Sequence, residues 1–278
     1  MKGAKQIVFI CIGAAMILLA VGLIFAKKSN DKTSGQRGGE SGTEIFTGEV
    51  TALVMQAGAC NIEVEAGDED VYTLVYEGLK YGDLTHNLEN GELEISYKQD
   101  DDWTAKMFSA EDLDDQKITL IVPKNATLDS ALFEFGAADI EMEQVVANKL
   151  YITVGAGELD ADSLTATELA RFNVGAGAFY ADNVKLMNAE LVCGVGEMEV
   201  SGVIAGESTA DCGVGSMQLT LDGEQENYRG ELNCGLGELQ FGDIQIDGSG
   251  RKDYGPSSAE RRMDIKCGIG EVDVRFND

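Results

Sequence analysis

Four cysteines recur at one position of a repeated motif, immediately before a Gly-x-Gly, in the second half of the chain. They are Cys193, Cys212, Cys234 and Cys267. Thiols aligned in this way could bind a soft metal ion or form disulfides. However, Val154 holds the same position in an earlier copy, and neither a histidine nor a closely spaced cysteine pair accompanies the thiols. The pattern therefore favours cysteine as a small buried hydrophobic residue, and we expect no metal and no cofactor here.

The residue after each Gly-x-Gly is acidic or small, which is typical of a solvated face on which neutral residues separate like charges. A calcium-binding β-roll would need Gly-Gly-x-Gly-x-Asp twice per coil, and this chain has one Gly-x-Gly per coil. Calcium binding at Asp100–Asp102 or Glu111–Asp115 remains an alternative. The column after the glycines consists of Glu158, Ala178, Glu197, Ser216, Glu238 and Glu271.

Motifs of the common enzyme classes are missing from the sequence. The only histidine, His86, lies in a polar stretch without an evident partner. There is no Gly-x-Ser-x-Gly, no Cys/His pair and no phosphate loop, and no helix follows the Gly-x-Gly copies. We therefore expect a protein that is not an enzyme. A glycan-active enzyme remains an alternative, although no pair of carboxylates is nominated as catalytic.

One segment carries a cluster of basic residues in an otherwise acidic body. Residues 247–262 (DGSGRKDYGPSSAERR) form an insertion before the last Gly-x-Gly copy. An inserted loop on one face of a repeat protein is often its binding face, so we predict a partner-binding loop; a mobile, solubilising loop is the alternative. The candidate residues are Arg251, Lys252, Tyr254, Arg261 and Arg262.

The spacing of the Gly-x-Gly copies predicts the architecture that positions these residues. Successive first glycines are separated by 19, 20, 19, 19, 22 and 33 residues, the last two intervals being lengthened by insertions. A repeat of about 20 residues indicates stacked units that bury apolar faces against their neighbours. An earlier, degenerate copy stands at Gly58. The first glycines are Gly136, Gly155, Gly175, Gly194, Gly213, Gly235 and Gly268.

Each copy alternates apolar and polar residues on both sides of the glycines, and the alternation slips by one residue inside the Gly-x-Gly. This slip predicts a corner between two strands, with glycine supplying a positive φ. We expect a third strand from pairs such as Leu164 with Ala166, Val184 with Leu186, and Val203 with Ala205. We also expect the middle residues to point inward, namely Ala156, Ala176, Val195, Val214, Leu236 and Ile269.

The predicted fold class is therefore all-β, a β-solenoid of stacked, mostly parallel coils preceded by one transmembrane helix. Residues 44–278 form the solenoid domain, with a less regular opening and cap at 44–130 and the Gly-x-Gly repeats at 131–278. Residues 29–43 are polar and glycine-rich, which is typical of a flexible linker.

The first residues predict a membrane anchor. Residues 7–26 are apolar, long enough to span a bilayer core of roughly 30 Å, and flanked by lysines. We interpret 1–28 as a short cytoplasmic tail and an uncleaved anchor that places the C-terminal domain outside the cell. A formal net charge of -28 argues against nucleic acid and anionic lipid surfaces as partners of that domain.

The succession of QAGACNIEVEAG, GELEISY, ITLIVPKN and a final DIKCGIGEVDVRF resembles a bacterial family of unknown function, often labelled "putative adhesin" or β-strand-repeat protein. The resemblance covers nearly all of residues 44–276. It implies a cell-surface scaffold or adhesin-like binding module, without catalytic residues. An interaction partner in envelope-stress sensing is the alternative. The implied partner is another envelope protein or a surface glycan.

Overall fold

The computed structural model describes residues 39–99 and 116–277. These residues form 23 strands and a short 3-10 turn, η3 (Gln225–Asn227), which confirms the all-β prediction. Within them no helix combines the length and apolar character that a membrane crossing needs. The predicted anchor at 7–26 and both acidic runs considered for calcium lie outside the described residues.

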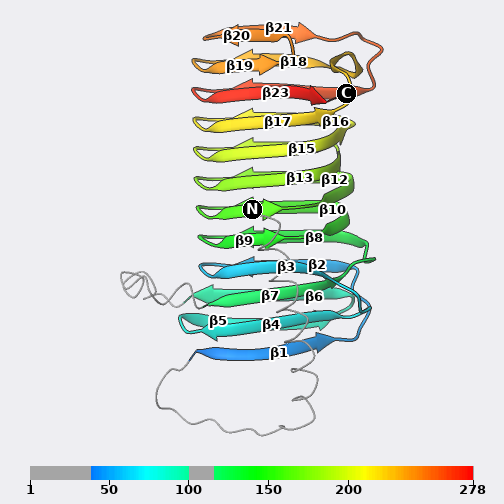
Figure 1. The fold of residues 1–278 in the computed structure, drawn as a ribbon, viewed down its shortest axis with the longest axis vertical. Coiled ribbons are helices and arrows are strands. Elements are labelled where there is room, and N and C mark those ends of the chain that lie inside the picture. Colours follow the sequence, from blue (N-terminus) through cyan, green and yellow to red (C-terminus); the bar gives the residue numbers. More distant parts are fainter. Residues whose placement is uncertain (1–38, 100–115, 278) are drawn as a thin grey trace, which may run out of the picture. The chain divides into compact units, whose positions relative to one another are not determined.

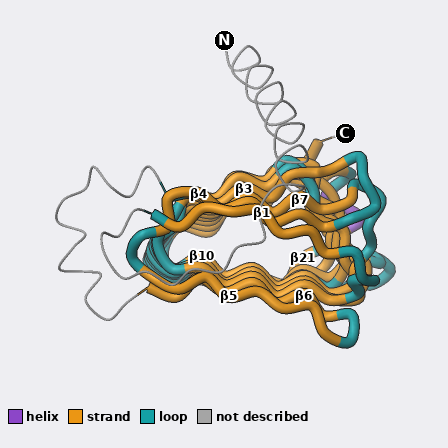
Figure 2. Tube along the Cα trace, turned by 90° about the horizontal axis from the view of Figure 1, so that it is seen from below, coloured by secondary structure: helices purple, strands orange, loops and turns teal. Residues whose placement is uncertain are grey.

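The strands stack in two layers with the core between them (Figures 1 and 2). In each coil a strand of the first sheet leads through a corner into a strand of the second sheet. In stacking order the first sheet consists of β5 (Gly82–Glu89), β6 (Glu92–Gln99), β2 (Ala52–Ala57), β8 (Leu128–Phe135), β10 (Val145–Val154), β12 (Leu164–Val174), β14 (Ala189–Cys193), β16 (Glu207–Cys212), β22 (Arg261–Cys267), β18 (Tyr228–Cys234) and β21 (Gly250–Tyr254).

The second sheet follows the same order of coils and has one additional strand, β1, outside β4. It consists of β1 (Glu40–Phe46), β4 (Tyr72–Leu79), β7 (Lys117–Pro123), β3 (Asn61–Gly67), β9 (Asp139–Met142), β11 (Glu158–Ala161), β13 (Ala178–Met187), β15 (Glu197–Ala205), β17 (Ser216–Asp222), β23 (Glu271–Asn277), β19 (Glu238–Phe241) and β20 (Ile244–Asp247).

Equivalent positions of the repeat lie directly above one another, as the spacing predicted. Val154 pairs with Val174, which pairs with Cys193, and Cys193 pairs with Cys212, all in parallel register. Because side chains alternate between the two faces of a strand, this register keeps every inward residue in a column. Phe172 contributes to these columns, fully buried like its neighbours. The core between the sheets is therefore continuous from coil to coil.

The coils at the C-terminal end do not stack in sequence order, as a simple succession would require. The last coil, β22–β23, lies between β16–β17 and β18–β19 (Figure 1). After β17 the chain forms the coil β18–β19 and leaves one layer open between the two coils. The antiparallel strands β20 and β21 then cover β18–β19, and β22–β23 occupies the open layer. Antiparallel strands protect the exposed edge of the outermost coil.

The opposite end is built in the same way. The coil β6–β7 lies between β2–β3 and the antiparallel strands β4 and β5, and β1 covers β4. These strands lie within residues 40–123, so most of them fall in the segment 44–130 that we predicted to be an opening and cap. Strand β1 begins at Glu40, inside the segment 29–43 that we predicted to be a linker, because Glu40–Phe46 pairs with β4.

All strand pairs of the described residues lie inside the unit formed by residues 39–278. Both caps and the whole buried core also belong to it. Because these strand pairs and this core are complete within the unit, we expect residues 39–278 to fold as a domain of their own.

The middle residues of the Gly-x-Gly corners point outward, so the inward prediction is wrong. Val195 is 67% exposed and Leu236 is 76% exposed. The backbone N–H of Val195 donates to the carbonyl of Gly175 in the neighbouring coil at 2.9 Å. The corner thus continues the ladder between coils, and the middle side chain faces water.

The corner glycines are required by close stacking and not by a positive φ, which none of them has. A Cβ atom on Gly215 would lie 2.0 Å from the carbonyl oxygen of Gly196. The first glycine of a corner is also crowded, since a Cβ on Gly194 would lie 2.6 Å from the oxygen of Gly175. Only glycine lets consecutive corners approach this closely.

The third apolar pair is confirmed in two coils and wrong in one. Leu164, Ala166, Val184 and Leu186 are buried, whereas in the next coil Gly202 and Ile204 point inward in place of Val203 and Ala205. Strand β13 carries an additional residue at Asp182-Asn183, with Asn183 at φ 52°, so its register with β15 shifts after this corner. The shift changes which residues of β15 face the core.

Candidate binding surface

The predicted partner-binding segment is part of the C-terminal cap and not a free loop. Arg251, Lys252 and Tyr254 lie on β21, which pairs with β18 at the end of the stack. The Arg251 guanidinium forms an ion pair with Glu231 on β18. Lys252 is exposed, and within residues 39–99 and 116–277 its ammonium group has no hydrogen bond or ion pair.

Tyr254 is buried under this cap. Its hydroxyl donates to the carbonyl oxygen of Met263 at 2.7 Å, and its ring centre lies 4.2 Å from that of Phe241. Burial raises the pKa of the phenol far above its ordinary value, so the hydroxyl remains a donor at neutral pH. Tyr254 therefore attaches β21 to the coil β22–β23.

The remaining two candidates also contact their own chain. Arg261 donates to the carbonyl oxygen of Asp222 at 3.1 Å and to the Tyr228 hydroxyl at 3.0 Å, with its guanidinium 5.3 Å from the Tyr228 ring centre. Arg262 forms a two-pronged ion pair with Asp264, the shortest contact being 2.8 Å. Of the five candidates, Lys252 is the one that points into solvent without such a contact.

The cysteine column is confirmed as core. In space its order is Cys193, Cys212, Cys267 and Cys234, because β22–β23 lies inside the stack. All four thiols are free and at most 3% exposed. Burial raises the pKa of Cys267 to about 11, which keeps this thiol protonated at neutral pH. In the described part of the chain no cluster of three or more His, Cys, Asp or Glu residues could hold a metal ion.

The second sheet presents a ladder of carboxylates. Glu63, Glu141 and Asp160 are in direct register on β3, β9 and β11. Burial, followed by repulsion from Glu63 and Asp160, raises the pKa of Glu141. Burial and then Glu63 raise the pKa of Glu65 to about 7. Lys117, whose Nζ lies 2.6 Å from Glu63, offsets part of this repulsion.

Like charges are less well separated than the sequence predicted. Ser216 separates Glu197 from Glu271, but Glu271 pairs directly with Glu238. Glu238 and Glu271 belong to consecutive Gly-x-Gly copies, and the position of β22–β23 beside β18–β19 keeps them in adjacent coils at an outer end of the column. The prediction of neutral residues at alternate coils is therefore wrong at this end.

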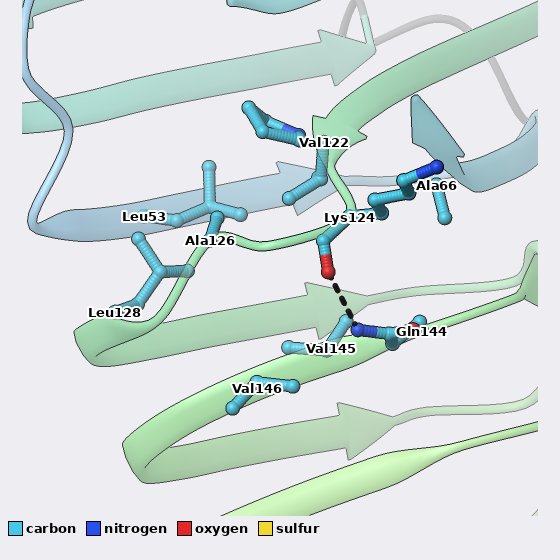
Figure 3. Close-up of a pocket in the computed structure, with 10 residues that line it drawn as sticks. Leu53, Ala66, Val122, Lys124, Ala126, Leu128, Gln144, Val145 and Val146 are labelled. Carbon is cyan, nitrogen blue, oxygen red and sulfur yellow. Dashed lines mark hydrogen bonds between the residues drawn. The ribbon is translucent and has the colours of Figure 1, made fainter. Parts of the chain in front are cut away.

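One small enclosed cavity lies between the coils, and an open hollow of about 610 Å³ is lined by residues of η3, β19 and β23. The cavity in Figure 3 has a volume of about 10 Å³, roughly that of one water molecule. It lies at a corner beside Val122 and Leu128, where Gln144 Nε2 donates to the Lys124 carbonyl oxygen at 3.0 Å. His86, on the edge strand β5, packs edge-on against the Phe46 ring at 5.8 Å. The cavity of Figure 3 offers no space for an organic ligand.

Residues 50–272 match the model of the family described as Toastrack DUF4097. The chain belongs to this family. The match runs from just before β2 to the start of β23, and it confirms the resemblance seen in the sequence. No curated protein matches the chain.

Several solved structures are similar to the chain at low identity and low TM-score. A "putative cell adhesion protein" of Clostridium sporogenes is 13% identical, with a TM-score of 0.37, over 86% of this chain and 100% of the other. A "putative adhesin" of Bacteroides fragilis is 17% identical, with a TM-score of 0.36, over 84% and 97%. A "Putative lipid binding protein" of Parabacteroides distasonis is 17% identical, with a TM-score of 0.39, over 87% and 98%.

Proposed function

We propose that this Toastrack protein is a non-enzymatic binding module, anchored in the cell membrane by residues 7–26 and displaying its β-solenoid outside the cell. The observation that carries the proposal is the surface of the stack. Its outward side chains form long ladders, such as Glu63–Glu141–Asp160, on a rigid frame. A continuous ladder surface of this kind suits an extended macromolecular partner.

The partner in this proposal is another envelope protein or a surface glycan. The Toastrack family membership supports a surface module in the sense of the "putative adhesin" label. Lys252, exposed at the capped end of an acidic body, provides a distinct point for contact with an acidic group.

The experiment is a quantitative capture on immobilised full-length protein in nanodiscs, with solubilised native membranes or wall fragments as prey. Deletion of residues 247–262 would remove the cap strand β21 and disturb the fold. We therefore compare the wild type with Lys252→Glu, and the matched control is Lys98→Glu, which changes another exposed lysine. Stoichiometric retention of one membrane protein or one glycan fraction supports the proposal. Retention of neither, or turnover of the glycan, contradicts it.

Selective loss of binding in Lys252→Glu would place the contact at the C-terminal cap. Equal binding by both variants would place it elsewhere on the solenoid. Protease access to the C-terminal domain in intact cells checks the proposed orientation.

A further inference from the structure

The outward middle residues of the Gly-x-Gly corners, together with Ala137 of the corner Gly136–Ala138, form a continuous line along one edge of the stack. Each one's backbone N–H donates to the first glycine of the neighbouring coil, so their order in space follows the coils. We call this line the corner ridge. From the N-terminal end it consists of Ala137, Ala156, Ala176, Val195, Val214, Ile269 and Leu236.

The corner ridge is apolar at every step, although the corner itself does not require this. The Gly-x-Gly backbone needs glycine on both sides, but its middle side chain projects into water. Stacking on neighbouring coils leaves Val214 still 56% exposed and Ile269 62% exposed. Contiguous exposed apolar residues rimmed by polar ones are typical of an interaction site. The four largest members are adjacent at the C-terminal end, where the insertion of β22–β23 brings Ile269 between Val214 and Leu236.

The rim of this large half is acidic on one side. The column two residues beyond the ridge holds Glu197, Ser216, Glu271 and Glu238 in register. On the other side Lys266 is neutralised by Asp211, with 3.3 Å between Nζ and the carboxylate. The surface is thus a strip of aliphatic side chains with a net negative border.

We infer that the large half of the corner ridge binds a basic amphipathic helix of a partner protein; this inference rests on the proposed function as a binding module. Apolar residues of the helix would cover Val195, Val214, Ile269 and Leu236, and lysine or arginine on its flank would pair with the border carboxylates. A second copy of this chain or an anionic lipid surface carries the same sign of charge and is disfavoured.

The dimensions favour a helix over an extended strand. Coils repeat every ~4.8 Å along the ridge, close to the ~5.4 Å pitch of an α-helix. Over the three intervals from Val195 to Leu236 the mismatch accumulates to only about 2 Å, so successive turns can face successive coils. A strand repeats same-face side chains every ~6.8 Å and loses register within two coils.

The test measures the affinity of residues 39–278 for a synthetic leucine–lysine amphipathic helix by fluorescence anisotropy. A leucine–glutamate helix of the same pattern is the control for charge. The ridge variant carries Val214→Ser, Ile269→Ser and Leu236→Ser. Its matched control carries Ala137→Ser, Ala156→Ser and Ala176→Ser at the small end of the same ridge, and thermal melting checks that both variants are folded.

We expect the lysine helix to bind the wild type and the control variant, and to bind the ridge variant at least tenfold more weakly. The variant Glu197→Gln, Glu238→Gln, Glu271→Gln should show a similar loss and a weaker dependence of affinity on salt. Absence of binding to the wild type, equal binding to the ridge variant, or equal binding of the glutamate helix would overturn the inference.

Two further measurements assign the surface to another occupant if the inference is wrong. Ridge-dependent co-sedimentation with phosphatidylcholine or phosphatidylglycerol vesicles would indicate a membrane surface. A dimer in sedimentation equilibrium that is lost in the ridge variant would indicate a second copy. Either result overturns the helix. The capture experiment uses native partners and therefore tests the proposed function separately. If a full-length ridge variant still retains a partner, the protein is a binding module, but the corner ridge is not its binding site.

Discussion

At the scale of single residues, the corner glycines are the strictest requirement of the fold. From Gly157 onward, the second glycine of each corner lies against the backbone of the neighbouring coil, where even a methyl group has no space. The residue between the glycines is free of this constraint because it faces solvent. Adjacent positions in the chain therefore differ sharply in what substitutions they accept.

Gly215→Ala should lower the free energy of unfolding by roughly 2–3 kcal/mol, because its Cβ would lie 2.0 Å from the Gly196 oxygen and the coils must separate. Val214→Ala, one residue away, should change it by less than about 0.5 kcal/mol. Urea unfolding of residues 39–278 measures both. Equal costs for the two variants would contradict the stacking account of the glycines.

Glu65 should make the stability of the body depend on pH. Its pKa is raised from an ordinary 4.5 to about 7 by burial and by Glu63, so the folded state holds this proton more tightly than the unfolded state. This contribution is complete below about pH 4.5 and is lost as the pH rises through 7. Glu65→Gln should therefore reduce the fall in melting temperature between pH 5 and pH 8.

The control for this prediction is Glu94→Gln, which changes an exposed carboxylate on the opposite sheet. It should leave the pH dependence of the melting temperature as in the wild type. If Glu65→Gln also leaves it unchanged, the Glu63–Glu65 repulsion is relieved by motion of the side chains.

At the scale of elements, the decisive feature is that β22–β23 lies inside the stack. Asp211 and Asn233 are each in register with Lys266, one on either side of it. Stacking in sequence order would instead place Asp211 next to Asn233. The two arrangements predict different neighbours for the same three positions.

The pair Asp211→Cys with Lys266→Cys should therefore be bridged by a short thiol-reactive cross-linker, since adjacent strands lie ~4.8 Å apart. The pair Asp211→Cys with Asn233→Cys should not be bridged, because a whole coil separates the two positions. Mass spectrometry of the cross-linked peptides reads the result. Efficient bridging of the second pair alone would support stacking in sequence order.

At the scale of the whole molecule, both ends are closed by antiparallel strands, and at each end the chain fills an inner layer of the stack only after it has formed these strands. Each end therefore depends on a segment that is distant in sequence. An ordinary solenoid could lose its last coil and retain the rest, because each coil contacts only its neighbours. Here the last coil joins β16–β17 to the capped coil β18–β19.

A chain that ends at Ala259 should lose cooperative folding of its C-terminal coils and aggregate. The removed strands leave β16, β17, β18 and β19 with unpaired edges inside the stack. Size-exclusion chromatography and thermal melting of the truncated residues 39–259 provide the measurement. A monomer with a single transition only a few degrees lower would show that the inserted coil is dispensable.

The sequence by itself determined the repeat, the strands and the core, because burial imposes a period of two and stacking imposes a period of about 20 residues. The column of Cys193 could be assigned to the core for this reason. The order of the coils could not be predicted from the sequence, because Cys234 and Cys267 lie in the same local pattern. Protection of the sheet edge by the cap decides which of the two coils lies outermost.

Only the tertiary structure decided the surface. Leu236 looks like a core residue by composition, yet the corner backbone joins the ladder between coils and turns its side chain to water. Conversely, Tyr254 and Arg261 lie in a basic, polar segment but contact their own chain, because the segment pairs with β18 as a cap. The local sequence pattern determines which residues of a strand face the core and which face outward. The path of the chain between distant coils determines which of the outward residues a partner can contact.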